Sequence, residues 1–425
     1  MKANRQTQRV KPTSAERVGA LTVVLVLLSL GVGATDLRFD AAVFDQGPVI
    51  DGVLDDEVWT GASEVEGFVQ FEPEFGTPSP FRTVVLIGFT PDTLYVAFRT
   101  FAPDPARIAA AVTSRDGDLE RDDSVMVSLD TFHNGRTAYF FSTNTLSVQT
   151  DGKVADNGRT VDTKWDGTWE CAASRTEDGW SVEFAIPFRM LRFKGGDDVS
   201  WGINFQRRVP RRLETSLWSG PGESQWRVSE FGSVDGLAVR ATDFKKIAFI
   251  PYTLVVGEKG ESVEVEIGAD LRFRIANNMS ADLTVNPDFA LIEADGEQIN
   301  LTRFELFVPE KRPFFLEGIE MCEQRIQQFY SRRIGDITAG GKFVGEPGGF
   351  EIAAIATRSD LEHEDPGGAS PALVDADYTV LRMVRGVFGS STIGLLAANR
   401  RAEGENTGSF GLDTTLFFSE TLGMT

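Results

Sequence analysis

The sequence predicts an all-β protein in two parts, an antiparallel β-sandwich followed by antiparallel up-and-down strands of a β-barrel type. Short apolar runs separated by turn residues fill the first part, with little helical pattern between them. This regular strand spacing is typical of two sheets packed face to face. The second part contains a fourteen-residue segment, Ser262 to Ile275, that alternates apolar and polar residues without a break. Such alternation predicts a long strand whose two faces meet different surroundings.

The composition is that of a folded protein with room for two domains or more. The chain has 425 residues, of which 41% are hydrophobic and 25% are charged, so disorder is not expected. The formal net charge is −21. We expect no nucleic-acid partner, because a phosphate backbone is bound by clustered lysine and arginine.

Residues 1–34 have the pattern of a signal peptide. Basic residues between Lys2 and Arg17 precede a nearly continuous apolar run, Gly19 to Leu30, and Val32-Gly33-Ala34 supplies the small residues of a cleavage site. The apolar run is shorter than the roughly 20 residues that span a bilayer. We therefore expect an exported protein.

Residues 35–240 are predicted to form the sandwich. Turn sequences such as Pro91-Asp92 and Asp178-Gly179 separate the apolar runs. Trp59, Trp180 and Trp201 are expected in its core. The predicted strands are Val84–Ile87, Thr93–Phe98, Ser124–Leu129, Thr137–Ser142, Trp180–Ile186 and Trp201–Phe205.

Two tryptophans in the sandwich are candidates for stacking on a ligand. Trp165 and Trp169 lie in the run Lys164-Trp165-Asp166-Gly167-Thr168-Trp169, where polar residues separate them. An indole at a surface presents a flat apolar face beside a polar N–H group. Both rings are therefore candidate surface residues for stacking on a ligand.

Four aspartates form a candidate calcium site. Asp116 and Asp118 flank Gly117, and Asp122 and Asp123 follow closely. Calcium takes several carboxylate and carbonyl oxygens from such a turn, so calcium is the one candidate cofactor. A solvated acidic loop accounts for the same residues.

No catalytic residue is identified. Two cysteines, Cys171 and Cys322, and two histidines support neither a zinc site nor a Cys–His dyad. A bridge between the two cysteines and two separate thiols both remain open. The sequence has no nucleophile-elbow serine, and no pair among its 63 acids is marked as a glycosidase pair.

The sandwich carries a series of motifs in a fixed order. It opens with Val49 to Trp59 (VIDGVLDDEVW) and closes with Trp226-Arg227 and Phe231-Gly232. This series resembles carbohydrate-binding module family 9-like domains, which implies a sugar-binding sandwich of the kind that accompanies several glycoside hydrolases. The motifs between its ends are Leu94-Tyr95-Val96, Asp123-Ser124-Val125, Gly179-Trp180, Glu183, Ile186-Pro187 and Gly202 to Phe205.

Only some of the family's sugar-binding residues are present in this sequence. Sugar-binding members clamp the sugar between two tryptophans. Trp226 matches one of them, while Glu120 stands at the position of the other. Met126 and Ser142 replace an acid and an arginine that bind sugar hydroxyls. The resemblance therefore implies half a clamp, with Trp226 as its candidate ligand-binding residue.

Residues 241–425 are predicted to form strands of an outer-membrane barrel type. Apolar residues at every second position of Ser262–Ile275 would face lipid, and the residues between them would face the lumen. A second soluble sandwich is the alternative. Further strands are predicted at Lys246–Val256, Ser280–Asn286, Asp336–Val344, Gly349–Arg358, Asp377–Phe388, Ser391–Arg400 and Gly408–Phe418.

A second set of motifs lies in this region. The motifs are Leu283–Phe289, Glu293-Ala294-Asp295, Gln298–Phe304, Pro309–Gly318 and Tyr330–Gly335. They resemble the bacterial family of domain of unknown function 5916, whose members carry a family 9-like module in front and barrel-type strands behind. Members generally run several hundred residues further, so the resemblance implies an incomplete barrel here.

The segment Asp282 to Gly318 is expected to fold inward or across the mouth of the barrel. Glu293 to Glu297 would then meet water, and Pro313-Phe314-Phe315 would pack against the wall.

These observations predict a carbohydrate-binding protein of the bacterial cell envelope, with a periplasmic sandwich beside an outer-membrane barrel. The first alternative is an O-glycosyl hydrolase of carbohydrate catabolism. It is suggested only because several members of the resembled family accompany glycoside hydrolases. The second is a structural or transport barrel whose sandwich binds nothing. Ligand identity and oligomeric state stay open.

Overall fold

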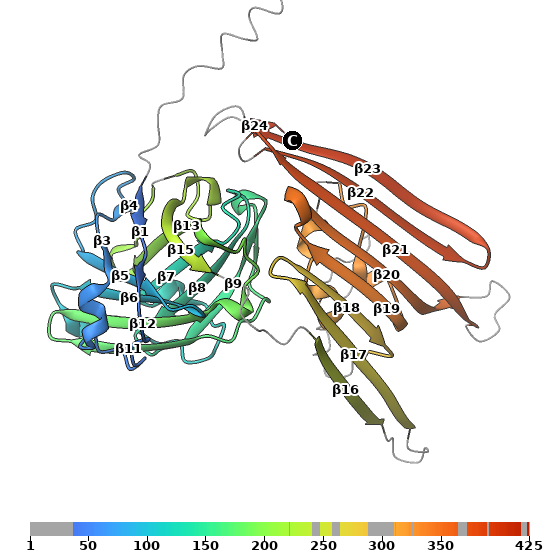
Figure 1. Cartoon of the computed structure of the whole chain (residues 1–425), viewed down its shortest axis with the longest axis horizontal. Helices are drawn as coiled ribbons and strands as arrows, with labels where there is room; N and C mark the ends of the chain where they lie inside the picture. The colour runs from blue at the N-terminus through green and yellow to red at the C-terminus, as the bar shows by residue number, and fades with distance from the viewer. Residues whose placement is uncertain are drawn as a thin grey trace, which may run out of the picture.

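A computed structural model gives the fold of the chain (Figure 1). It describes residues 37–220, 222–239, 247–256, 264–287, 310, 312–322, 324, 326–363, 372–388, 391–417 and 423–424. The predicted signal peptide and the acids Glu293 to Glu297 lie outside the described residues. The described part is almost entirely β-structure in three sheets.

The first two sheets form the predicted sandwich. One sheet has the order β1 (Arg38–Asp40), β15 (Gly232–Val239), β13 (Gly196–Val209), β7 (Ser124–Asp130), β8 (Ala138–Asn144), β9 (Gln149–Ala155) and β10 (Thr160–Asp162), with β14 (Glu214–Leu217) paired to β13 and β4 (Val69–Glu72) paired to β14. The other has the order β11 (Glu170–Thr176), β12 (Gly179–Pro187), β6 (Thr93–Phe101), β5 (Thr83–Phe89) and β2 (Ala42–Val43), with β3 (Ser63–Val65) on β5. The pairing is antiparallel except at β1–β15 and β2–β5, which are short parallel pairs.

The core lies between these two sheets. Trp180 and Trp201 are 1% and 0% exposed, and Trp59 is 4% exposed, which confirms the expectation that these three rings are internal. Trp59 donates its indole N–H to Glu183 at 2.7 Å, and Gly52 donates its backbone N–H to the same carboxylate at 2.8 Å. The buried acid thus ties the start of the domain to β12.

The third sheet follows the chain order without a crossover. Each strand pairs antiparallel with its neighbours in sequence, so the sheet is the predicted up-and-down meander. The described strands form an open sheet and do not close into a barrel. They are β16 (Ile247–Val256), β17 (Glu264–Ala276), β18 (Met279–Val285), β19 (Asp336–Gly345), β20 (Phe350–His363), β21 (Ala372–Val387), β22 (Ser391–Ala402), β23 (Glu405–Phe417) and β24 (Gly423–Met424).

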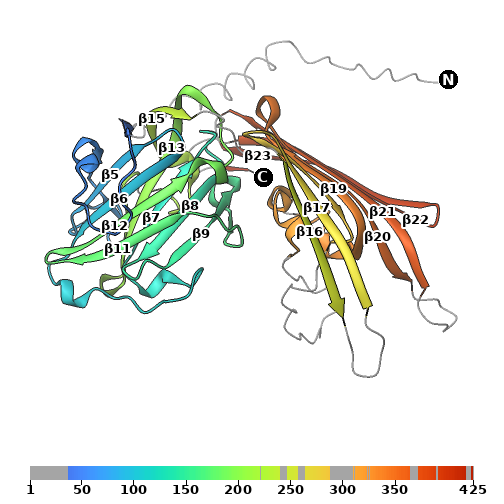
Figure 2. The same ribbon diagram turned by 60° about the horizontal axis from the view of Figure 1, so that its bottom comes forward.

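The two faces of the third sheet differ in chemistry, as the alternation along β17 predicts. The register of the strand pairs places large exposed hydrophobic side chains on one face, which we call the apolar face. Ile267 and Leu412 on it are each 72% exposed. Its exposed members are Ile247, Phe249, Val255, Val265, Ile267, Ile275, Leu283, Val285, Ile393, Phe410 and Leu412. The opposite face carries the polar residues of β17 and β18, and Ser280 and Glu351 on this face bond to Arg192 and Arg136 of the sandwich. Figure 2 shows the third sheet beside the sandwich.

A short helix covers part of that opposite face. It is α2 (Pro313–Leu316), and it lies between the third sheet and the sandwich in both views (Figures 1 and 2). Phe314 and Phe315 are buried among Ile337, Ile355, Tyr378, Val380 and Leu396 of the sheet. The prediction that these phenylalanines pack against the wall is therefore confirmed.

The remaining helical elements are single turns of 3-10 helix. None of the helices in the described ranges is long and apolar enough to cross a bilayer. The 3-10 turns are η2 (Glu57–Gly61), η3 (Pro105–Arg107), η4 (Leu119–Arg121), η5 (Asp156–Gly158), η6 (Phe188–Met190), η7 (Pro210–Arg212), η8 (Val228–Glu230), η9 (Ile319–Cys322), η10 (Ser331–Arg333) and η11 (Pro347–Gly349).

Candidate functional site

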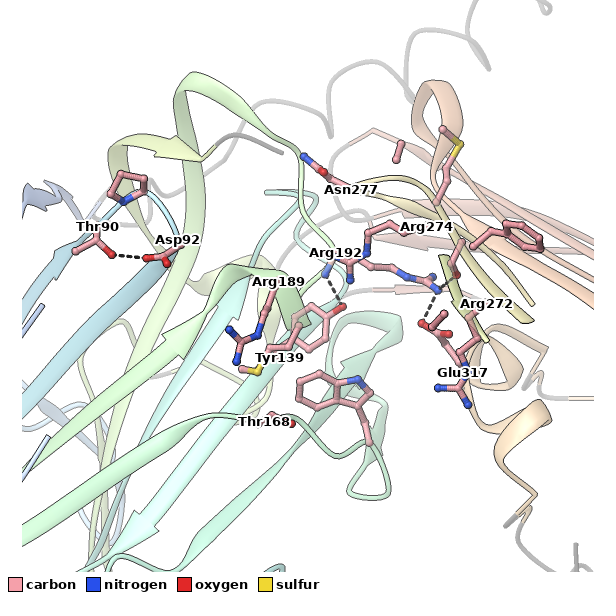
Figure 3. A pocket seen from close by; sticks show the side chains of 18 of the residues that line it. Thr90, Asp92, Tyr139, Thr168, Arg189, Arg192, Arg272, Arg274, Asn277 and Glu317 are labelled. Atoms are coloured by element: carbon pink, nitrogen blue, oxygen red, sulfur yellow. Dashed lines mark hydrogen bonds and ion pairs between the residues drawn. The ribbon is translucent and has the colours of Figure 1, made fainter. Parts of the chain in front are cut away.

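A pocket of about 1110 Å³ lies where the sandwich meets the third sheet (Figure 3). We call it the junction pocket. It is lined from both sides, so neither part forms it alone. The sandwich contributes Asp45, Gly47, Thr90, Pro91, Asp92, Tyr95, Tyr139, Trp165, Thr168, Arg189, Met190 and Arg192, and the rest of the chain contributes Ala248, Arg272, Phe273, Arg274, Ala276, Asn277, Met279, Ser280, Asp282 and Glu317.

One wall of the junction pocket is aromatic. Tyr139 projects from β8, and Trp165 lies in the segment between β10 and β11. Their ring centroids are 4.9 Å apart, with an angle of 56° between the ring planes. The ammonium group of Lys153 lies 5.7 Å from the Tyr139 ring and 5.8 Å from the Trp165 ring. The wall therefore combines apolar ring surface with a nearby positive charge.

Arg115 and Asp151 bind the segment that carries Trp165. Arg115 donates to the carboxylate of Asp151 at 2.9 Å and to the carbonyl oxygen of Gly167 at 3.0 Å, and it also pairs with Asp166. Asp151 further accepts the indole N–H of Trp169. Burial raises the pKa of Asp151 to about 6, although the bond from Trp169 and the charge of Arg115 oppose this rise.

The other wall is rich in arginine. Arg192 from the sandwich donates to Glu317, which follows α2, and to the hydroxyl oxygen of Ser280 on β18. Arg272 and Arg274 lie on β17, and Figure 3 shows both near Arg192 and Glu317. Burial, followed by the charge of Arg192, lowers the pKa of Arg274.

Glu317 is the principal carboxylate of this wall. Burial by itself raises the pKa of Glu317, but Arg192, Lys153, Lys342 and Arg272 outweigh it and lower this pKa to about 2. Glu317 is therefore ionised at neutral pH. Lys342 on β19 lies 4.0 Å from Glu317 and 3.1 Å from Asp282.

Of the tryptophans predicted to bind a ligand, only Trp165 lines the junction pocket. The prediction for Trp169 was wrong. Its side chain is 4% exposed, and its ring is stacked on Phe184 at 5.5 Å and contacts Phe141 edge-on at 5.3 Å. Trp169 belongs to the core, where Asp151 accepts its indole N–H.

Trp226 lies apart from the junction pocket, in an apolar cluster. The cluster contains the buried side chains of Met126, Phe140 and Val228. The rings of Trp226 and Phe140 have centroids 5.0 Å apart and planes tilted by 59°. Apolar side chains thus surround this half-buried ring where the resemblance implied hydroxyl-binding groups. Sugar stacking on Trp226 stays a prediction.

The four aspartates predicted to hold calcium serve different local roles. Asp122 accepts the backbone N–H groups of Ala111 and Val112, each at 3.0 Å, and Asp123 accepts that of Ala109 at 2.8 Å. Asp118 caps η4, and Asp116 lies 3.6 Å from Arg115. Within the described ranges, no group of three or more acidic, histidine or cysteine side chains is arranged to hold a metal ion. Calcium binding stays a prediction.

A second pocket, of about 990 Å³, lies between β8 and β9 of the sandwich and the third sheet. Two ion pairs lie in it. Arg136 of the sandwich donates to Glu351 of the third sheet, whereas Arg382 donates to Asp413 at 3.0 Å within that sheet. Burial, together with the charge of Glu351, raises the pKa of Glu346 to about 7. We interpret the Arg136–Glu351 pair as a contact that holds the sheet against the sandwich.

The fold and site define a two-part all-β protein with a polar and aromatic pocket at its junction. Residues 245–345 match the family described as Domain of unknown function (DUF5916), which confirms the resemblance of the motifs in this region. No curated protein matches the chain.

Solved structures similar to the chain include two of a carbohydrate binding module family 9 from Caldicellulosiruptor kristjanssonii. The one with cellotriose is 19% identical, covers 48% of this chain and 95% of that one, and has a TM-score of 0.35. The one with glucose is 20% identical, covers 49% and 99%, and also has a TM-score of 0.35. A putative carbohydrate-binding protein from Bacteroides uniformis is 13% identical, covers 47% and 98%, and has a TM-score of 0.40.

Proposed function

We propose that this protein binds a carbohydrate in the junction pocket. The observation that carries the proposal is the aromatic wall of Tyr139 and Trp165 opposite the polar wall of Arg192, Ser280 and Glu317. A sugar ring has an apolar C–H face that packs on an aromatic ring and hydroxyl groups that bond to polar side chains. The pocket supplies both kinds of surface.

The volume supports an oligosaccharide rather than a single sugar. At about 1110 Å³, the pocket is as large as the larger small-molecule sites of proteins, which reach roughly 1,000 Å³. Tyr95 and Arg189 also line it, so several sugar units have polar and aromatic partners within reach.

The proposed setting is the bacterial outer membrane, with the sandwich in the periplasm. Two observations support this setting, namely the signal-peptide pattern of residues 1–34 and the apolar face of the third sheet. Single exposed hydrophobic residues are ordinary, but exposed hydrophobic residues gathered on one face of a sheet indicate contact with lipid or another apolar surface. Glycosyl hydrolysis and solute transport stay alternatives from the sequence.

The test is a binding measurement on the full-length chain in detergent, first on a glycan array and then by calorimetry with the best ligand. Trp165→Ala should raise Kd at least tenfold, because it removes half of the aromatic wall. Trp226→Ala tests the other candidate residue, and because Trp226 lies outside the junction pocket, Kd should change less than twofold if the sugar binds in that pocket. Unchanged binding by Trp165→Ala, or loss of binding only in Trp226→Ala, would place the sugar elsewhere.

A further inference from the structure

We infer that the saccharide bound in the junction pocket is acidic and carries a carboxylate or sulfate group that meets the arginine wall. This inference rests on the proposed carbohydrate function of the same pocket. Its evidence is the distribution of charged side chains along the pocket, whereas the evidence for the proposed function is the aromatic wall.

Arginine side chains gather at the end of the pocket near the third sheet. Arg192, Arg272 and Arg274 line this end, together with two carboxylates, Glu317 and Asp282. Lys342 lies 3.1 Å from Asp282 and 4.0 Å from Glu317, so both acids have a cationic neighbour besides the arginines.

Another acid of the pocket, Asp92, lies at its other end. Asp92 follows β5 in the second sheet of the sandwich, and its carboxylate accepts a hydrogen bond from the hydroxyl group of Thr90 at 2.8 Å. Figure 3 shows Thr90 and Asp92 well separated from Arg272, Arg274 and Glu317. The pocket therefore has an acidic end and a cationic end, and the aromatic wall lines it as well.

The carboxylate of Glu317 accepts a hydrogen bond from Arg192, one of the arginines that line this wall. Arg272 has an exposed side chain that makes no hydrogen bond or ion pair with any described residue, and the same is true of Arg189. A guanidinium group offers a planar pair of N–H donors that matches the two oxygens of a carboxylate or sulfate. An anionic group on a bound sugar would supply these acceptors.

The two walls thus bind different parts of the saccharide. Tyr139 and Trp165 pack against the sugar ring, and the wall that contains Arg272 binds the charged substituent. Neutral sugars use only the first of these interactions. We therefore expect preference for acidic over neutral saccharides, and we expect added salt to weaken that preference, because exposed charge pairs are screened.

The test compares trigalacturonate with its methyl ester, which keeps the sugar and removes the charge. A sulfated galactose trisaccharide and inorganic sulfate are the other probes, all titrated into the full-length chain in detergent. We expect trigalacturonate or the sulfated sugar to bind at least tenfold more tightly than the neutral ester. The tighter of the two identifies the anionic group.

Arg272→Gln should raise Kd for the acidic sugar about tenfold and leave binding of the neutral ester unchanged. Arg400→Gln, an exposed arginine on β22 outside the pocket, is the matched control and should change neither. Equal affinity for charged and neutral sugars, both lost in Trp165→Ala, would overturn this inference and leave the proposed function standing. No binding of any saccharide, or binding of inorganic sulfate as tight as that of the sugars, would overturn both.

Discussion

Arg192 and Glu317 form an ion pair across the junction between the sandwich and the third sheet. Arg192 follows η6 in the sandwich, whereas Glu317 follows α2, 125 residues later in the chain. The same guanidinium group also donates to Ser280 on β18. One side chain of the sandwich therefore contacts both a strand of the third sheet and the segment that covers it.

We expect Glu317→Gln to weaken the junction at neutral pH and to have little effect near pH 2. The pKa of Glu317 is lowered to about 2 in the folded protein, so its stabilising charge is present above the ordinary value of 4.5 and is lost as pH falls toward 2. The side chain is 37% exposed, and solvent screening limits the expected effect to about 1 kcal/mol.

Urea unfolding of both proteins between pH 2 and pH 7 measures this difference. A loss of stability that is the same at all these pH values would contradict the assigned role. Because the substitution removes a negative charge from the arginine wall, the variant should also bind trigalacturonate several-fold more tightly.

We expect Arg115→Ala to loosen the segment that carries Trp165. The variant loses the bonds to Asp151 and to the carbonyl oxygen of Gly167. Saccharide affinity should fall about threefold to tenfold, while the fold persists. The ¹⁹F NMR signal of 5-fluorotryptophan at Trp165 should broaden or shift. Arg107→Ala, which removes an exposed ion pair with Asp104, should do neither.

We expect Phe315→Ala to destabilise the third sheet by about 3–5 kcal/mol, because it leaves a cavity in a closed apolar cluster. The Phe315 side chain is 0% exposed, and the guanidinium of Arg312 lies 4.4 Å from its ring centroid. Hydrogen exchange of β19 to β22 measures the effect. Phe388→Ala is the control, since that side chain is 88% exposed. Similar exchange in the two variants would mean that the cluster does not hold α2 on the sheet.

We expect stability to fall between pH 4 and pH 6 through Asp130. Burial raises the pKa of Asp130 from 3.8 to about 6, against opposing hydrogen bonds from the Gly135 and Phe132 backbones. The folded protein therefore binds more protons than the unfolded chain in this window, and ionisation above it costs up to about 3 kcal/mol. Asp130→Asn should flatten this dependence in urea unfolding. An unchanged slope would show that another group titrates.

The periodic features of the fold were predictable from the sequence. The alternation along β17 predicts which side chains share a face, because successive residues of a strand point to opposite sides. The phenylalanines of α2 pack on the third sheet as predicted. Two adjacent apolar rings gain by leaving water, and their own segment is too polar to bury them. Trp180 and Trp201 lie within apolar runs, and both are in the core.

The junction pocket was not predictable in the same way. Trp165 and Trp169 are four residues apart in similar surroundings, yet Trp165 lines the pocket and Trp169 lies in the core. The arginines of β17 were visible as polar positions of an alternating strand. These arginines lie close to Tyr139 and Arg192 only because of how the third sheet packs against the sandwich. The alternation of residues within one strand does not predict that packing.

The aspartates from Asp116 to Asp123 illustrate a different limit. Their spacing suggests oxygen ligands, yet Asp122 and Asp123 are directed to the backbone N–H groups of residues 109–112. A carboxylate can bind an amide as well as a metal, and the sequence does not distinguish the two uses.

The chain-order pairing of the third sheet has a consequence for how it assembles. Hairpins between successive strands need only short loops to close, whereas pairing of β18 with β19 must close the loop of residues 286–335. Phe314 and Phe315, inside that loop, pack on strands that come after it. We therefore expect β19 to β23 to form around α2 as one kinetic unit, with the hairpins of β16 to β18 joining it in a slower step.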